Sequence, residues 1–293
     1  MRVWVEAARP KTLAAALAPV VLGAGLAWAE GGFAGSVTLL ALLSAAAIQI
    51  GTNYYNDYAD FKKGADTAER KGPPRATAMG WVAPGAMKRA AIVAFTLAVL
   101  LGLPLMIRGG WPIAAIGFSG IAFGYLYTAT RYSLAYLGIA DLFVLAYFGP
   151  IAVAGTVYLN TLAWSKEAIW AGFGPGLFAV AILLVNNIRD IETDERSGKR
   201  TLVVRIGKQK AVKLLHVTLG CALVPPLWLM PLSTVGLLGA ASLVAIVIFG
   251  LIRSQRVLVD DRQARGANDL LAGIGQLLMV YSLLFASVMA FAS

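Results

Sequence analysis

Residues 90–107 read AAIVAFTLAVLLGLPLMI, and after a short Arg108-Gly-Gly break residues 111–128 read WPIAAIGFSGIAFGYLYT. Neither stretch contains a charged side chain, and each is long enough as an α-helix to cross the ~30 Å hydrocarbon core of a bilayer. Because lipid offers the backbone no hydrogen bonds, helix is the conformation expected of such stretches. Seven further apolar stretches predict helices of the same kind: Thr12–Ala29, Ser36–Asn53, Leu134–Val157, Ala168–Asn187, Lys213–Met230, Thr234–Ile252 and Leu270–Ala292.

The composition of the chain supports this fold class. Of its 293 residues, 59% are hydrophobic and 14% are charged, whereas a soluble domain carries roughly 25% charged residues. A soluble protein of this size could not bury so many apolar side chains, so the bilayer is expected to be the solvent. We therefore predict an all-α, multi-pass membrane protein with nine transmembrane helices, formed as a single domain over residues 1–293.

The basic residues predict its orientation. With nine crossings, 23 of the 25 Lys and Arg residues fall on the side that holds the N-terminus, and only Arg108 and Lys166 fall on the other. The positive-inside rule then places the N-terminus in the cytoplasm and the C-terminus outside. The net charge of +10 is thereby explained by the membrane and its anionic headgroups rather than by nucleic acid. We expect a cell-membrane protein that contacts lipid and has no evident need of a protein partner.

The acidic residues are concentrated in two short segments, which hold eight of the 15 in the chain. The first segment reads Asn53-Tyr-Tyr-Asn56-Asp57-Tyr-Ala-Asp60 and continues to a further acid, Asp66. On a helix, positions 53, 56, 57 and 60 lie on one face. The segment is therefore predicted to present stacked oxygen atoms where the second helix leaves the membrane.

The second segment reads Asn186-Asn187-Ile-Arg-Asp190-Ile-Glu-Thr-Asp194. It follows Ala168–Asn187, the sixth apolar stretch along the chain, and is predicted to lie at the same membrane face as the first segment. Residues 186, 190 and 194 step by four and again share one helix face. Stacked carboxylates repel one another and need cations, and Mg²⁺ is held by a few carboxylates together with substrate phosphates. Bases able to grip phosphate lie close by in both segments: Arg70, Lys71, Arg75, Arg189, Lys199 and Arg205. Solvated loops with incidental ion pairs are the alternative interpretation.

The two motifs together resemble the UbiA superfamily of intramembrane aromatic prenyltransferases. Further stretches are similar to one branch, the 1,4-dihydroxy-2-naphthoate polyprenyltransferases of menaquinone synthesis. In that branch the third acid of the first motif corresponds to Asp66, whereas branches that act on 4-hydroxybenzoate have an acid at the position of Gly64. The stretches that carry the resemblance are residues 8–13, 56–66, 72–75, 135–138, 141, 148–150, 187–190 and 198–205.

The resemblance implies nine helices around a central cavity and a reaction. A polyprenyl diphosphate would ionise to an allylic cation, and the naphthoate ring would attack it with loss of CO₂, giving demethylmenaquinone. Mg²⁺ would be held by the acids of both motifs with one amide: Asp57, Asp60, Asp66, Asp190, Asp194 and Asn56. The four aspartates Asp57, Asp60, Asp190 and Asp194 would be catalytic in this sense. The diphosphate would be bound by Asn53, Arg70, Arg75, Tyr127, Arg131, Asn187, Lys199 and Arg205.

Alternatives remain at the acceptor end. Asp141 lies within the fifth apolar stretch, and an acid inside a membrane is a functional candidate. It is expected either to face the aromatic acceptor or to pair with Arg131, and Lys11 is a weaker candidate for the acceptor carboxylate.

The same chemistry on 4-hydroxybenzoate or homogentisate is a second hypothesis, and an anion transporter is a third. The length of the prenyl chain and the oligomeric state are open.

Overall fold

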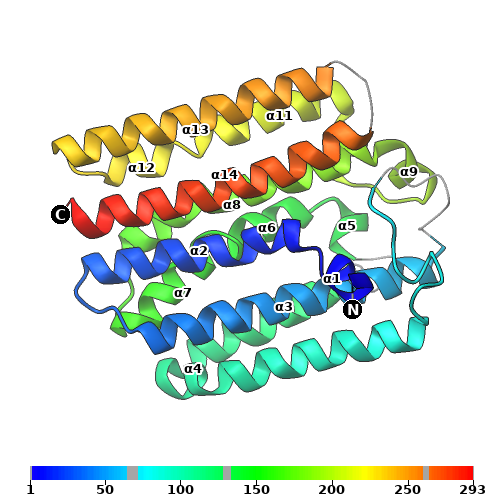
Figure 1. Ribbon diagram of the computed structural model, residues 1–293, viewed down its shortest axis with the longest axis horizontal. Coiled ribbons are helices and arrows are strands. Elements are labelled where there is room, and N and C mark those ends of the chain that lie inside the picture. The colour runs from blue at the N-terminus through cyan, green and yellow to red at the C-terminus, as the bar shows by residue number, and fades with distance from the viewer. Residues whose placement is uncertain (1, 65–71, 128–132, 260–263, 293) are drawn as a thin grey trace.

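A computed structural model describes residues 2–64, 72–127, 133–259 and 264–292, and these residues form helices and connecting turns without a strand (Figure 1). The predicted all-α class is confirmed. The helices are α1 (Arg2–Ala8), α2 (Pro10–Ala29), α3 (Gly35–Lys62), α4 (Pro84–Leu126), α5 (Leu134–Leu137), α6 (Ala140–Tyr147), α7 (Pro150–Thr161), α8 (Lys166–Arg189), α9 (Ile191–Arg196), α10 (Leu202–Ile206), α11 (Lys208–Cys221), α12 (Val224–Leu229), α13 (Thr234–Val259) and α14 (Ala264–Phe291).

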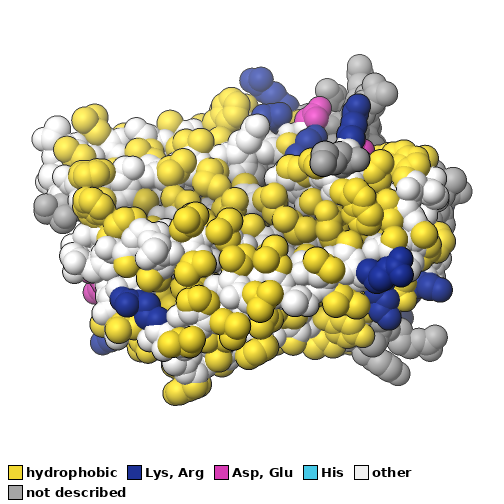
Figure 2. Space-filling view, turned by 60° about the horizontal axis from the view of Figure 1, so that its bottom comes forward, with side chains coloured by type: hydrophobic (Ala, Val, Ile, Leu, Met, Phe, Trp, Pro, Cys, Tyr) yellow, Lys and Arg dark blue, Asp and Glu magenta, His cyan; other side chains and the backbone are white. Residues whose placement is uncertain are grey.

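Eight helical segments of the described chain are long and apolar enough to cross a membrane. Six are single helices, and two are composed of a pair, α6 with α7 and α11 with α12. Hydrophobic side chains cover the middle of the face shown in Figure 2, and basic side chains lie toward its ends. This distribution is the one that a bilayer-spanning bundle requires, because charged groups must reach the polar headgroups.

The longest helix, α4, combines two of the predicted stretches. It has 43 residues, and Gly110 inside it adopts a non-helical backbone with φ 69° and ψ −158°. This positive φ is accessible to glycine at no steric cost, and the ribbon reverses direction there (Figure 1). The break expected at Arg108-Gly-Gly is therefore present.

Two other stretches predicted as single helices are interrupted. The stretch Leu134–Val157 is divided into α5, α6 and α7, with breaks at Gly138 and at Gly149-Pro150. The seventh is divided between α11 and α12 just before the Pro225-Pro226 pair. Proline has no amide hydrogen and clashes with the preceding turn, which accounts for the breaks at 149–150 and 225–226.

The central helix is α8, which packs against α2, α6, α7, α11, α12 and α14 and is mostly buried. Small residues allow this close packing: a Cβ atom added to Gly172 would lie 2.5 Å from the Cα atom of Pro150. On the other side of α8, Phe178 packs against Tyr281 of α14, whose hydroxyl donates to the Ala222 carbonyl at 2.7 Å. The C-terminal end of α8, which carries the second motif, is thereby held at a fixed place in the bundle.

Candidate active site

A cavity of about 420 Å³ runs between the helices and is lined by both predicted motifs. Its wall along α3 begins at Ala41 and ends at Asp60, so one end of the cavity is apolar and the other polar. The apolar end is completed by Val20, Leu105, Ile113 and Leu159. The polar end is lined by Asn53, Asn56, Asp60, Arg75, Asn186, Asn187, Asp190, Asp194 and Lys199.

Asp60 is the carboxylate of the first motif that faces the cavity. It is 2% exposed, and its Oδ2 accepts a hydrogen bond from the Arg75 guanidinium at 3.0 Å. Its Oδ1 is buried and accepts no hydrogen bond from the described part of the chain. Asp60 therefore holds a basic residue on one oxygen and presents the other to the cavity.

Asp57, which was predicted to share this face, lies differently. Its carboxylate accepts hydrogen bonds from the backbone amides of Ala76 and Thr77, each at 3.0 Å. Asn53, Asn56 and Asp60 line the cavity, but Asp57 does not. By its spacing, Asp57 lies at the edge of the helix face that Asn53, Asn56 and Asp60 form. The turn at residues 75–77 packs against that edge and binds the Asp57 carboxylate.

The second motif begins where α8 ends. Asp190 caps the helix, and α9 starts at the next residue, so the predicted single helix through Asp194 is interrupted there. The Arg189 guanidinium donates hydrogen bonds to both oxygens of Asp190, at 2.8 and 2.5 Å, and to Asn186 Oδ1 at 2.7 Å. A fourth hydrogen bond, 2.6 Å long, joins Arg189 to Asn268 Oδ1 on α14. Arg189 thus fixes the Asp190 carboxylate.

Lys199 connects the two motifs. Its Nζ lies 3.8 Å from Asp60 Oδ1 and 3.7 Å from Asp194 Oδ1. Tyr136 lies beside this group, with Lys63 Nζ 4.7 Å and Lys199 Nζ 6.0 Å from its ring centroid. Burial raises the pKa of Tyr136, and the charges of Asp60 and Asp194 raise it further. The predicted meeting of the two motifs at one end of the bundle is therefore observed.

The model of the UbiA prenyltransferase family matches residues 16–291 of the sequence. The chain belongs to this family. It is 36% identical to the 1,4-dihydroxy-2-naphthoate octaprenyltransferase of Mycobacterium tuberculosis over 98% of this chain and 97% of that one. It is 39% identical to the enzyme of the same name from Escherichia coli over 71% of this chain and 70% of that one.

Solved UbiA structures have the same fold. The UbiA homologue of Archaeoglobus fulgidus bound to GPP and Mg²⁺ superposes with a TM-score of 0.67, at 16% identity, over 98% of this chain and 99% of that chain. At this identity the likeness concerns the fold alone.

Some of the residues predicted to bind substrate line the cavity of this UbiA chain, and others do not. Asn53, Asn187 and Tyr127, predicted to bind the diphosphate, line the cavity. Arg205 does not, because its guanidinium donates to the carbonyls of Arg200 and Leu137 at 3.0 and 2.7 Å. The predictions for Asp66, Arg70 and Arg131 lie outside the described residues.

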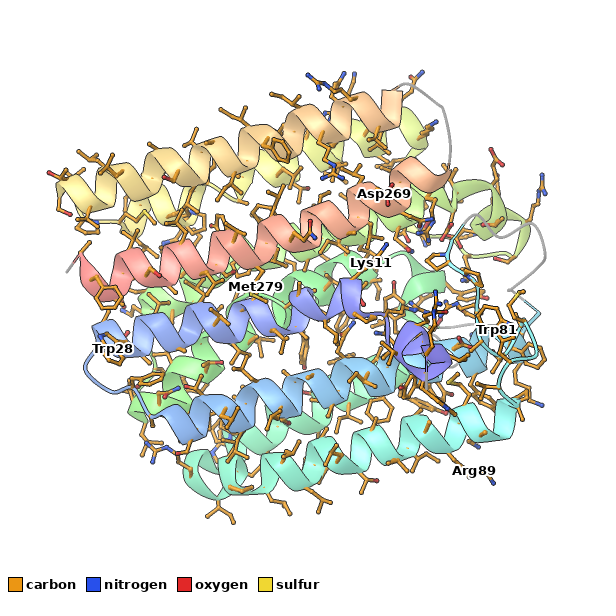
Figure 3. All side chains as sticks on the ribbon, viewed as in Figure 1. Lys11, Trp28, Trp81, Arg89, Asp269 and Met279 are labelled. Atoms are coloured by element: carbon orange, nitrogen blue, oxygen red, sulfur yellow. The ribbon has the colours of Figure 1, made fainter. Side chains whose placement is uncertain are left out.

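The two predicted acceptor contacts are not at the cavity. Lys11 is exposed near the start of α2 (Figure 3), and Asp141 is buried off the cavity-lining face of α6. Arg9, which was not in the predicted site, lines the cavity instead. Its backbone has φ 53°, an unfavourable value for a residue with a Cβ atom, and such strain is often found at functional sites. No residue type or spacing in the sequence signals this conformation.

The donor atoms of the UbiA site fit a particular kind of metal binding. Within the described ranges no three His, Cys, Asp or Glu side chains converge closely enough to hold a metal by themselves. Mg²⁺ usually takes one or two carboxylates and completes its shell with water and substrate phosphates. The buried Asp60 Oδ1, which accepts no hydrogen bond from the described residues, and the nearby Asp194 carboxylate match that requirement. The site therefore fits Mg²⁺ that is bound together with a diphosphate.

Proposed function

We propose that this protein transfers a polyprenyl group from polyprenyl diphosphate to 1,4-dihydroxy-2-naphthoate, with loss of CO₂ and diphosphate, in menaquinone biosynthesis. The observation that carries the proposal is the joining of a charged cluster to an apolar cavity in one continuous space. A polyprenyl diphosphate has the same division into a charged head and an apolar tail. The acceptor is inferred from the names of the relatives at 36–39% identity.

The diphosphate end is assigned to the polar end of the cavity. Lys199 and Arg75 are two bases that line it, and both lie beside Asp60. Asn53, Asn187 and Tyr127 supply further hydrogen-bonding groups on the same wall. Mg²⁺ held by Asp60 and Asp194, with Asn56 and Asp190 lining the same end of the cavity, would neutralise charge on the leaving diphosphate.

The cavity wall must protect the reaction from water. When the bond between the allylic carbon and the diphosphate oxygen breaks, the diphosphate takes the electron pair. The ring carbon that carries the carboxylate forms the new carbon–carbon bond, and loss of CO₂ returns an electron pair to the ring. Phe123, Phe143, Tyr147 and Phe148 line the cavity and exclude water, while their ring faces favour a cation. This sequence of bonds needs no general base, so it does not depend on Asp141 or Lys11.

The membrane arrangement follows from the same reasoning. A straight 43-residue helix would be about 65 Å long, roughly twice the ~30 Å hydrocarbon core. We therefore assign two crossings to α4 and nine to the chain, as one domain with the N-terminus and the active site at the cytoplasmic face of the cell membrane. Exposed Trp28 and Trp81 lie at opposite ends of the bundle, as interfacial tryptophans do (Figure 3).

An acceptor panel tests the proposal. Purified protein in detergent receives Mg²⁺, a polyprenyl diphosphate and, separately, dihydroxynaphthoate, 4-hydroxybenzoate or homogentisate. Formation of the prenylated naphthoquinol and CO₂ from dihydroxynaphthoate alone is the expected result. Product from another acceptor alone would overturn the choice of acceptor, and no diphosphate release with any of them would favour an anion transporter.

A further inference from the structure

The carboxylate of Asp57 is occupied by one short turn of the chain. The backbone amides of Ala76 and Thr77 donate to its two oxygens at 3.0 Å each. The Thr77 hydroxyl contacts Oδ1 as well and lies 3.0 Å from the Asp57 carbonyl oxygen. Both side chains are buried, at 2% and 3% exposure, so these hydrogen bonds are shielded from water.

The turn held by Asp57 carries Arg75 into the cavity. Arg75 immediately precedes the two bound amides, is 7% exposed and lies 3.0 Å from Asp60 Oδ2. Asp57 and Asp60 are three residues apart and therefore lie on the same turn of α3. Through Asp57 this turn binds the backbone amides of the 75–77 segment, and through Asp60 it binds the Arg75 guanidinium. Both contacts help to hold Arg75 at the cavity.

We propose that Asp57 is a positioning residue for Arg75 and not a metal ligand. The two successive amides donate to different oxygens of the carboxylate, and an asparagine side chain would place its NH₂ donor against one of them. Turning the carboxylate toward the cavity would leave both amides buried without partners, which folded proteins avoid. The substrate side of this inference rests on the proposed function, since Arg75 is taken to bind the diphosphate.

The test compares Asp57→Asn with Asp60→Asn in the full-length protein in detergent. Hydrogen exchange of the 72–82 peptide is measured with a chelator present, and Mn²⁺ binding is measured by electron paramagnetic resonance. We expect Asp57→Asn to speed exchange at residues 76 and 77 by at least about tenfold and to change Mn²⁺ affinity less than about twofold. Asp60→Asn, which removes the proposed ligand, should weaken Mn²⁺ binding by at least about tenfold.

Thr77→Val is the milder variant if Asp57→Asn does not fold, because it keeps both amides and removes only the hydroxyl. It should speed exchange in the same peptide and retain Mn²⁺ binding. Unchanged exchange, or loss of Mn²⁺ affinity in either the Asp57 or the Thr77 variant, would overturn the proposal. Neither measurement involves a prenyl acceptor, so failure of the proposed function would be seen separately in the acceptor panel.

Discussion

The ammonium group of Lys199 lies 3.8 Å from Asp60, a residue 139 positions earlier in the chain and on the other acidic motif. Asp194 is 3.7 Å from the same nitrogen. One cation therefore faces two carboxylates that would otherwise repel each other across the cavity. This arrangement makes Lys199 the link between the two halves of the site.

Replacing Lys199 with methionine should harm both stability and turnover. The Asp60 and Asp194 carboxylates are almost fully buried, and removing the cation they share weakens the compensation of their charges, at a cost of about 1–3 kcal/mol of unfolding free energy. The loss of a cation from the leaving-group site should lower kcat/KM by roughly 100-fold. Thermal unfolding and steady-state prenyl transfer measure the two effects. Lys210→Met, on an exposed lysine, is the matched control and should change neither quantity.

The contact between Arg189 and Asn268 leads to a second prediction. Asn268→Leu removes the 2.6 Å hydrogen bond that connects α14 to the second motif. We expect the unfolding free energy to fall by about 1–2 kcal/mol and kcat to fall because Asp190 is held less firmly. Asp269→Asn changes an exposed neighbour on the same helix and should leave both measurements unchanged. Equal behaviour of the two variants would show that Arg189 needs no support from α14.

Close packing of α8 leads to a third prediction. Gly172→Ala would place a Cβ atom 2.5 Å from the Cα atom of Pro150, where neither backbone can move without disturbing the other helix. We expect a loss of about 1–3 kcal/mol, seen as a lower midpoint of thermal unfolding. Gly220→Ala is the control, because a Cβ atom there meets no atom within 4 Å and alanine favours helix. A Gly172 variant as stable as the Gly220 variant would show that α8 can shift.

The sequence predicts that the two motifs share one site, because the second and sixth apolar stretches have the same predicted direction and each ends in acids that need cations. It cannot separate Asp57 from Asp60, since both lie on one helix face by spacing and only the 75–77 turn distinguishes them. The positive φ of Arg9 is unpredictable for a different reason. Arginine does not favour that conformation, and tertiary contacts impose it: Asn53 on α3 donates to the Ala8 carbonyl at 2.9 Å.

The apolar part of the cavity leads to the last prediction. Gly155 lies on α7 between Phe148 and Leu159 of the cavity wall, and a Cβ atom there would meet Ile116 at an ordinary 3.5 Å. Gly155→Ala should therefore be tolerated, whereas the larger side chain of Gly155→Leu must extend into the space assigned to the prenyl tail. We expect the leucine variant to lower kcat/KM for an eight-isoprene donor by at least about tenfold and to change it less than about twofold for geranyl diphosphate. Competition between the two donors in one reaction measures this ratio directly. A leucine variant with the same ratio of kcat/KM for the two donors as the wild type would place the tail outside this part of the cavity.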